Sequence, residues 1–204
     1  MLKHQRRFWD MPNRIVLLIG GYGSGKTYIG ALKSLYMSYL NAPVPGMYIS
    51  PSHQLATKTI IITLKELCNR AEIDYTYNQQ RSEFIFHNWG GKLWLGSGDK
   101  PDSLRGPNIG WAVIDEPFIQ KREVFEQMIA RVRHPEAKKS QIFLTGTPES
   151  LNWGWVIAND PDMDIGVVQA STLDNPYLPD DYKQSLLQAY SEEQIEAYVH
   201  GKFV

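Results

Sequence analysis

Eight consecutive residues near the start of the chain have the residue types of a phosphate-binding loop. They fit the pattern G-x-x-x-x-G-K-[ST], which the segment 20–27 reads as GGYGSGKT. Glycines let backbone N–H groups turn towards a phosphate, the lysine reaches the β- and γ-phosphates, and the hydroxyl binds Mg²⁺. A glycine-rich turn that only caps a helix would not explain why lysine and threonine follow in that order. We therefore predict a nucleotide site at Gly21, Tyr22, Gly23, Ser24, Gly25, Lys26 and Thr27.

A pair of adjacent carboxylates follows an apolar segment about 90 residues later. The segment 111–116 reads WAVIDE, and neighbouring side chains at a strand end point in different directions. We expect Asp115 to hold Mg²⁺ together with Thr27, and Glu116 to orient and polarise a water for attack on the γ-phosphate. A strand that ends in an acidic turn is common, so the position downstream of the phosphate loop is what makes this pair informative.

A third polar group, Thr145-Gly146-Thr147-Pro148, follows the next apolar segment. The carboxyl ends of parallel strands open on the same side of a sheet, so this turn is expected near the γ-phosphate. Thr145 or Thr147 would then sense that phosphate and couple its presence to the rest of the molecule. An ordinary turn between a strand and a loop is the alternative.

Apolar runs and helical patterns alternate around these groups, and the alternation predicts how they are positioned. Strands are expected at 14–19, 47–50, 110–114 and 141–144, a hairpin at 84–95, and helices at 26–40, from about 52 to 70, and at 123–131. This order predicts an α/β fold: a P-loop NTPase core with a mainly parallel sheet flanked by helices. Residues 1–150 would form that core. Residues 151–204, with a strand at 166–170 and polar helices from 180 to 200, would form a small lid-like or linker subdomain.

Composition narrows the class of protein. The 204 residues are 43% hydrophobic and 21% charged, as in an ordinary globular protein, and no apolar run approaches the length that crosses a bilayer. A single cysteine, Cys68, cannot form an internal disulfide, which favours a reducing compartment. Residues 1–140 have a charge balance of +7 and residues 141–204 one of −8. A basic body with an acidic tail is compatible with nucleic-acid binding on one face, although chance would also produce it.

These motifs, in this order, resemble the ATPase domain of the large terminase subunit, the motor that packages DNA into tailed-phage capsids. The resemblance covers nearly the whole chain. It rests on HQRRFW (4–9), the phosphate loop, the hairpin, SLRG (103–106), VIDE (113–116), TGTP (145–148), LDNPYL (173–178) and the final GKFV. No single piece is diagnostic, but their order and spacing are. The resemblance implies a Mg²⁺-dependent ATPase that translocates double-stranded DNA into a viral procapsid.

The resemblance also implies roles for two residues outside the phosphate loop. Gln5 falls where the family contacts the adenine, with Phe8 or Trp9 stacking nearby or serving as a structural aromatic. Arg105 falls where some members place an arginine finger that reaches the nucleotide of a neighbouring subunit, and would then count among the catalytic residues with Lys26 and Glu116.

The arginines also allow alternative assignments. Arg105 could instead cap its glycine loop, and Arg131 and Arg133 are competing candidates for the finger. Many family members have an arginine inside the phosphate loop, where this chain has Tyr22, so activation in cis from that position is not expected. The family's nuclease domain has a cluster of metal-binding acids that the residues after Val168, which are mostly loop and helix, cannot form, so we expect an isolated ATPase domain.

The implied partners are double-stranded DNA, a homo-oligomeric ring on a portal, and a small terminase subunit, in the cytoplasm of the infected bacterial host. Lys58, Lys65 and Lys92 are candidates for DNA contact, although solvated surface lysines are the commoner case. A helicase-like ATPase is one alternative, but a helicase normally has two such domains in one chain. A nucleotide switch or small-molecule kinase is another, and it would not need Glu116 as a base.

Overall fold

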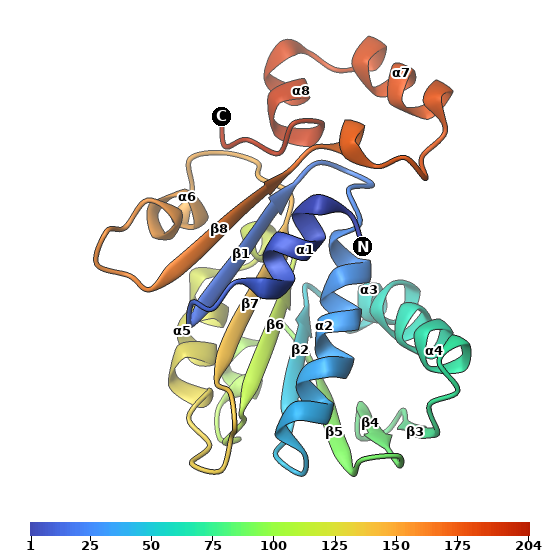
Figure 1. Cartoon of the computed structure of the whole chain (residues 1–204). Helices are drawn as coiled ribbons and strands as arrows, with labels where there is room; N and C mark the ends of the chain where they lie inside the picture. The colour runs from blue at the N-terminus through green and yellow to red at the C-terminus, as the bar shows by residue number, and fades with distance from the viewer.

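One eight-stranded sheet runs through the computed structural model, which describes residues 1–204, and its strand order is β3-β4-β5-β2-β6-β7-β1-β8 (Figure 1). The strands are β1 (Ile15–Gly20), β2 (Gly46–Ser50), β3 (Tyr75–Asn78), β4 (Glu83–Phe86), β5 (Gly91–Ser97), β6 (Trp111–Asp115), β7 (Gln141–Gly146) and β8 (Ile165–Ala170). Neighbours from β5 to β8 are parallel, and β3 and β4 are antiparallel at one edge. The predicted mainly parallel sheet and its hairpin are therefore confirmed.

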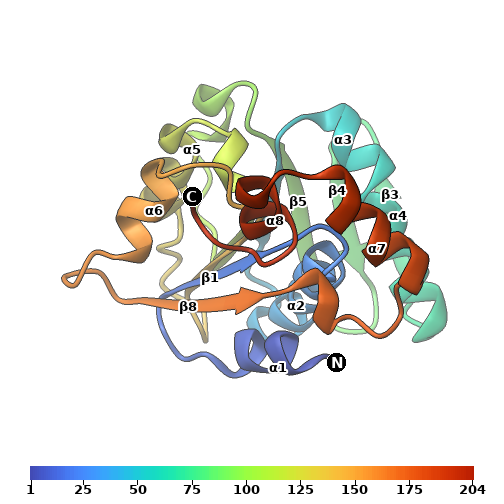
Figure 2. The same ribbon diagram turned by 90° about the horizontal axis from the view of Figure 1, so that it is seen from above.

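Helices cover both faces of this sheet (Figure 2). They are α1 (Lys3–Asp10), α2 (Lys26–Asn41), α3 (His53–Lys58), α4 (Ile60–Arg70), α5 (Arg122–Arg131), α6 (Trp153–Ala158), α7 (Asp180–Ala189) and α8 (Glu192–Tyr198). Alternating strand residues face the two sides, so the sheet supports two apolar cores. One core packs the sheet against α1, α2 and α4, and the other packs it against α5 and α6.

The single helix predicted from about 52 to 70 is wrong, because the structure divides it into α3 and α4. Thr59 separates the two helices with φ −126° and ψ −89°. Its hydroxyl donates to the carbonyl of Leu55 at 2.9 Å. The segment 57–63 consists of β-branched residues and one lysine, and β-branched residues lose rotamer freedom in a helix. A break in the helix at Thr59 therefore costs little free energy.

The last strand, β8, pairs in parallel with β1 along its whole length, from Ile15 opposite Ile165 to Gly20 opposite Ala170. Residues 165–170 are thus an edge strand of the core sheet, and a boundary at residue 150 does not coincide with the end of that sheet. Beyond Ala170 the chain forms α7 and α8, which lie over the carboxyl ends of the parallel strands (Figures 1 and 2). We call residues 171–204 the C-terminal segment.

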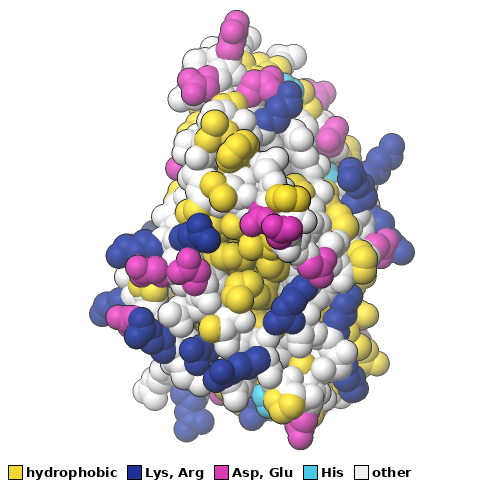
Figure 3. All heavy atoms as spheres, turned by 90° about the vertical axis from the view of Figure 1, so that its left-hand side faces the viewer, with side chains coloured by type: hydrophobic (Ala, Val, Ile, Leu, Met, Phe, Trp, Pro, Cys, Tyr) yellow, Lys and Arg dark blue, Asp and Glu magenta, His cyan; other side chains and the backbone are white.

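Charge is distributed unevenly over the surface. In Figure 3, Lys and Arg side chains predominate over the lower part of the face shown, with Asp and Glu side chains scattered among them, and Asp and Glu are the more frequent charged residues at the upper end. This agrees with the opposite charge balance of the two parts of the sequence. No helix is long and apolar enough to cross a membrane.

Candidate functional site

The phosphate loop connects β1 to the first turn of α2. Gly23 and Gly25 have φ values of +72° and +85°, a conformation that glycine adopts without strain. The backbone N–H groups of Gly25, Lys26 and Thr27 have no acceptor within the chain. These unpaired donors at a helix N-terminus form a concave site that favours an anion.

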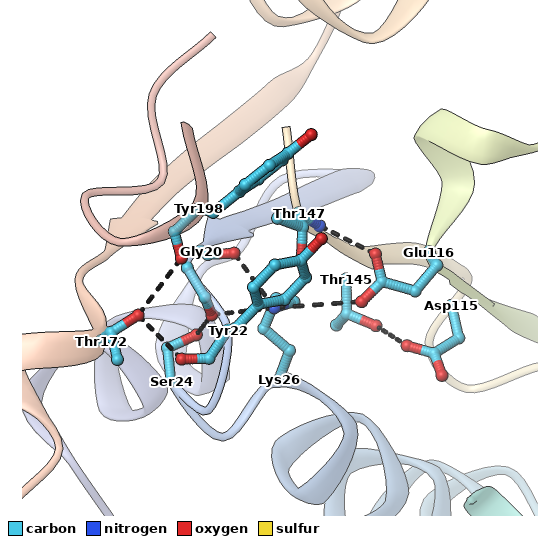
Figure 4. Close-up of polar contacts among 11 residues, drawn as sticks. Gly20, Tyr22, Ser24, Lys26, Asp115, Glu116, Thr145, Thr147, Thr172 and Tyr198 are labelled. Carbon is cyan, nitrogen blue, oxygen red and sulfur yellow. Dashed lines mark hydrogen bonds and ion pairs between the residues drawn. The ribbon is translucent and has the colours of Figure 1, made fainter. Parts of the chain in front are cut away.

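Lys26, predicted to bind the β- and γ-phosphates, is buried at the centre of the site (Figure 4). Its Nζ donates to the carbonyl oxygens of Gly20 and Gly21, each at 3.0 Å. It also lies 3.9 Å from Oε1 of Glu116. Burial lowers the pKa of Lys26, and the nearby charge of Glu116 opposes that shift. The ammonium is therefore fixed between the loop and the carboxylate pair.

Glu116 has the backbone conformation of a left-handed turn, with φ 45° and ψ 55°. This conformation is rare for a residue with a side chain and costs free energy. It directs the carboxylate towards Lys26 and towards the backbone N–H of Thr147, which donates to Oε2 at 2.9 Å (Figure 4). The structure therefore brings the predicted base, the loop lysine and the turn 145–148 together.

Asp115 lies one residue earlier but in a different environment. Its carboxylate is buried and accepts a hydrogen bond from the Thr145 hydroxyl at 2.9 Å. Burial, with a contribution from the charge of Glu116, raises the pKa of Asp115 to about 7. The two acids are therefore physically distinct, as expected from neighbours at a strand end.

The donors at this position suit Mg²⁺. A carboxylate and a hydroxyl are hard oxygen ligands, and Mg²⁺ normally takes few of them from the protein, because phosphate oxygens and waters complete its shell. Asp115 ends β6 and Thr27 follows Lys26 on α2. A cation beside Asp115 would also balance the buried carboxylate charge. The residues present therefore fit the ion chemically.

Thr147, one of the two predicted sensors, has a buried hydroxyl with no hydrogen-bond partner. The other, Thr145, already donates to Asp115. A buried hydroxyl without a partner is uncommon in proteins. Thr147 therefore has a free hydroxyl beside Glu116, whereas Thr145 has none.

Gln5 lies on α1 and contacts the phosphate loop directly. Its Nε2 donates to the Gly25 carbonyl at 3.1 Å, and its neighbour His4 hydrogen-bonds the Ser24 carbonyl through Nε2 at 2.8 Å. Phe8 is buried against Phe143, and Trp9 packs against Tyr36. These two aromatics are therefore structural contacts of α1.

Beside Gln5 the structure has a cavity of about 410 Å³, and the residues that line it include Tyr28, Asn175 and Tyr177. None of these three was predicted from the sequence. They come from α2 and from a loop about 150 residues away, so no local motif links them. Their aromatic rings and amide are side chains suited to a flat, polar-edged ligand such as a nucleotide base.

The C-terminal segment holds the first half of the loop. The backbone N–H of Tyr22 donates to the Tyr198 carbonyl at 2.8 Å, and the two rings stack with centroids 5.1 Å apart (Figure 4). Thr172 donates to the Tyr22 carbonyl at 2.7 Å, and Asn175 donates to the Gly23 carbonyl at 2.7 Å. Of the predicted nucleotide-binding residues, Tyr22 therefore has its N–H paired within the chain.

Two other predicted residues of the loop, Gly21 and Ser24, also have hydrogen-bond partners within the chain. The backbone N–H of Gly21 donates to the Ala170 carbonyl at the end of β8. The Ser24 hydroxyl donates to the Gly21 carbonyl at 2.7 Å. The second half of the loop is thus left with the free N–H groups.

Arg105 lies outside this cluster. Its guanidinium is exposed and pairs with Asp102 three residues earlier, at 3.0 Å. It makes no ion pair or hydrogen bond with the phosphate loop or with Glu116. Of the competing arginines, Arg133 donates to Asn108 at 2.8 Å, and Arg131 has a buried Nε without a partner. Arg105 and Arg133 are both exposed, and Arg105 is the one that pairs with an acid, the exposed Asp102.

The three candidate DNA contacts come from different elements. Lys58 ends α3 and Lys92 lies on β5, and both are exposed. Lys65, on α4, has its ammonium 5.0 Å from the centroid of the Tyr77 ring. The structure thus assigns a partner within the chain to Lys65 and leaves the other two side chains in solvent.

Comparisons with known proteins agree with this fold. The chain is 25% identical to the PBSX phage terminase large subunit of Bacillus subtilis over 211 residues, which cover 91% of the chain and 48% of that protein. The large terminase of a thermophilic bacteriophage, in complex with ADP, superposes with a TM-score of 0.86 at 15% identity, over 100% of this chain and 53% of that one. The ATPase domain of the Thermus phage P74-26 large terminase superposes with a TM-score of 0.72 at 14% identity, over 98% and 92%.

The chain therefore spans about half the length of the PBSX relative and of the ADP-bound terminase. At these identities the solved structures establish the fold alone. The family model for "Terminase large subunit, T4likevirus-type, N-terminal" matches residues 17–204, from β1 to the last residue. The match includes the phosphate loop, the two carboxylates and the C-terminal segment, and by it the chain belongs to the family of phage large terminase subunits.

Proposed function

We propose that this chain is the ATP-hydrolysing motor domain of a phage DNA-packaging enzyme. The observation that carries the proposal is the approach of the Lys26 ammonium to the Glu116 carboxylate, at 3.9 Å, together with the unpaired N–H groups of the phosphate loop. A switch or a small-molecule kinase would not need a carboxylate there. Family membership supports the packaging role.

The proposed reaction follows from this geometry. The free N–H groups at the start of α2 and the Lys26 ammonium bind the β- and γ-phosphates. Glu116 accepts a proton from a water that attacks the γ-phosphorus, while the bond from that phosphorus to the bridging oxygen breaks to give ADP and phosphate. When bound at Thr27 and Asp115, Mg²⁺ would neutralise charge on the phosphate oxygens.

Nucleotide binding must change the contacts of Lys26. Its ammonium now donates to two loop carbonyls, and it would exchange them for phosphate oxygens. Glu116 is held by the Thr147 N–H, and the free Thr147 hydroxyl lies in the same turn. We propose that this turn senses the γ-phosphate, with Thr147 as the contact, and that residues 171–204 act as a lid over the site.

The proposed partners follow from the family. Double-stranded DNA is the substrate that is moved, and copies of the motor assemble as a ring on a portal with a small terminase subunit, in the cytoplasm of the infected host. A ring would give the exposed Arg105 a neighbouring nucleotide to contact. Lys58 and Lys92, which are exposed, are available for DNA.

Two substitutions test the hydrolysis mechanism. Lys26→Ala removes the charge that neutralises the phosphates, so ATP binding should weaken and turnover should fall by on the order of 10²-fold or more. Glu116→Gln preserves an acceptor for the Thr147 N–H but removes the base, so ATP should still bind while turnover falls by roughly 10²- to 10⁴-fold. Binding is measured by titration with labelled ATP, and turnover by phosphate release.

Glu123→Gln is the matched control, because it makes the same chemical change at an exposed position in the first turn of α5. It should retain the parental turnover. Parental turnover in Lys26→Ala would refute the assignment of the phosphate loop. Equal loss of binding and turnover in Glu116→Gln would show that Glu116 is a structural acid.

A further inference from the structure

A second lysine on α2, Lys33, is buried as completely as Lys26 but has no part in the reaction proposed above. Only 1% of its surface is exposed. It lies seven residues after Lys26, which is two helical turns or about 10 Å along the same face. Lysine is rarely buried to this degree without a partner. The groups that surround the Lys33 ammonium should therefore show why a charge is retained at this position.

No carboxylate forms an ion pair with this ammonium, although the more distant charge of Asp10 favours its charged form and that of Lys139 disfavours it. Its Nζ donates to the Trp9 carbonyl at 2.8 Å, and it faces the rings of Trp9, Tyr36 and Phe143 at 4.7, 5.5 and 5.0 Å from their centroids. Aromatic faces attract a cation, and the attraction grows when water is excluded. Burial lowers the pKa of Lys33 to about 8. The site thus retains a charge at a free-energy cost, which a packing role alone would not require, because methionine would fill the same space.

The atom that Lys33 holds is one of the last carbonyls of α1. The last carbonyls of a helix have no N–H donor within that helix, and a cation near them is favourable. The other end of α1 contacts the phosphate loop through His4 and Gln5, which bond the carbonyls of Ser24 and Gly25. Helix α1 is only eight residues long and lies beside α2 (Figure 1). It is therefore fixed at one end by the loop and at the other by Lys33.

We propose that Lys33 is a positioning residue for nucleotide binding: it clamps α1 to α2 and thereby sets Gln5 against the loop and the adjoining cavity. Helix α2 then carries two lysines with different roles: Lys26 binds the phosphates, and Lys33 positions α1, whose Gln5 lines the cavity for the base. This inference rests on the proposed binding of ATP at the loop. Without the contact from Lys33, α1 and its Gln5 would no longer be held in position, whereas Lys26 and Glu116, which act on the γ-phosphate, would keep their positions.

The test is Lys33→Met, which preserves the packing volume and removes the charge. We expect the KM and the Kd for ATP to rise by roughly 10-fold, kcat at saturating ATP to stay within about twofold, and the preference for ATP over GTP to fall. Lys33→Arg, which retains a cation, should restore much of the affinity. Lys138→Met, the same change at an exposed lysine, should leave every value unchanged.

A double-mutant cycle separates positioning from general packing. If Lys33 acts through Gln5, then Lys33→Met combined with Gln5→Ala should weaken ATP binding no more than Gln5→Ala alone. Additive losses would overturn the proposal. So would equal losses for ATP and GTP accompanied by a lower Tm, which would show a structural role only.

Hydrogen exchange tests the clamp independently of the proposed function. In Lys33→Met the amides of residues 3–10 should exchange faster than in the parent chain, with no nucleotide present, while those of β6 remain protected. Unchanged exchange in α1 would overturn the clamp whatever the activity. Failure of the parent chain to bind ATP would instead overturn the proposed function, with the exchange result still deciding the role of Lys33.

Discussion

Asp115 and Glu116 illustrate how two identical functional groups acquire different properties at the scale of single residues. One carboxylate ends a strand inside the molecule and pairs with Thr145, and the other is turned outwards by a left-handed backbone and faces Lys26. Burial makes the charged form of Asp115 costly, whereas the charge of Glu116 is balanced by the ammonium. Their roles therefore follow from the backbone between them.

The raised pKa of Asp115 predicts a pH dependence of stability. Because its pKa is about 7 in the folded chain and 3.8 ordinarily, the folded state binds more protons between these values. Its contribution to stability is present below about pH 4 and is lost as the pH rises through about 7. Asp115→Asn should remove this loss, so the difference in unfolding free energy between variant and parent should grow across that window, by about 1.4 kcal/mol per pH unit at most.

Urea unfolding of both chains at about pH 4.5, 6 and 7.5 measures this difference, with no Mg²⁺ or nucleotide added. Taking the difference cancels the titration of the other acids. A difference that stays constant over the three pH values would show that Asp115 is already charged in the folded chain at the lowest of them.

At this scale the residues that could be predicted from the sequence are those that belong to local motifs. Lys26, Asp115 and Glu116 lie where the motifs predict a nucleotide site, because each motif forms within a few residues of a strand end. Lys33, Tyr198 and Asn175 were not predicted, because their partners are distant in the chain. Lys33 carried a signal nonetheless: seven residues after Lys26, it had to lie on the same buried face of α2.

At the scale of elements, the glycines of α2 and of the loop before it differ in how much space surrounds them. Gly30 lies inside the helix, and a Cβ there would be 3.5 Å from the Tyr48 hydroxyl and 3.7 Å from the Thr145 hydroxyl, which is ordinary contact. Gly21 lies in the loop, and a Cβ there would be 2.5 Å from the Val199 carbonyl and 2.6 Å from the Tyr198 carbonyl. Only the second glycine is required by its surroundings.

These contacts predict opposite effects of the same substitution. Gly30→Ala should stabilise the chain by up to about 1 kcal/mol, because alanine favours a helix and restricts the unfolded chain. Gly21→Ala should destabilise it by roughly 1–3 kcal/mol through overpacking, and should loosen the C-terminal segment from the loop. Thermal unfolding gives the stabilities, and limited proteolysis of residues 171–204 reports the loosening.

A Gly21→Ala chain as resistant to proteolysis as the parent would show that the C-terminal segment adapts to the added methyl. Gly30→Ala serves as the control for any general effect of replacing a glycine near the site. Destabilisation by Gly30→Ala would mean that α2 cannot approach β2 and β7 as closely as the structure has it.

The long apolar strands were predictable from the sequence, whereas strand β3 and helix α6 were not. The central strands lie within one or two residues of their expected bounds, because they are buried on both faces and read as unbroken apolar runs. Strand β3 is only partly buried and has four residues, which is too short a segment to show a clear alternation between apolar and polar residues. Helix α6 has six residues, which is too few to show a helical period of hydrophobicity. The break between α3 and α4 depends on one backbone conformation at Thr59.

Arg105 gives a prediction at the scale of the assembled molecule. Its guanidinium has no contact with the phosphate loop of its own chain. If it is a finger that acts between subunits, Arg105→Ala should leave the affinity of one chain for ATP unchanged and reduce turnover of the assembly by on the order of 10³-fold or more. Mixing Arg105→Ala with Lys26→Ala should restore hydrolysis, since the second chain can donate its arginine to the intact loop of the first.

Assembly of the mixture is verified separately by light scattering, and Lys100→Ala, at an exposed lysine five residues before Arg105, is the control for loss of a nearby positive charge. Mixed assemblies without recovered hydrolysis would return Arg105 to a role in its own loop, where it already pairs with Asp102.

The position of β1 in the sheet has a consequence for the order in which the chain is made. Its neighbours are β7 and β8, so residues 15–20 pair only with residues 142–146 and 165–170. A ribosome releases the N-terminus first, and this apolar strand then has two unpaired edges until residues 142–170 have been synthesised. Such late pairing slows folding and exposes the nascent chain to aggregation. The phosphate-binding motif is thus complete after 27 residues have been synthesised, but the strand that precedes it gains its partners only more than 100 residues later.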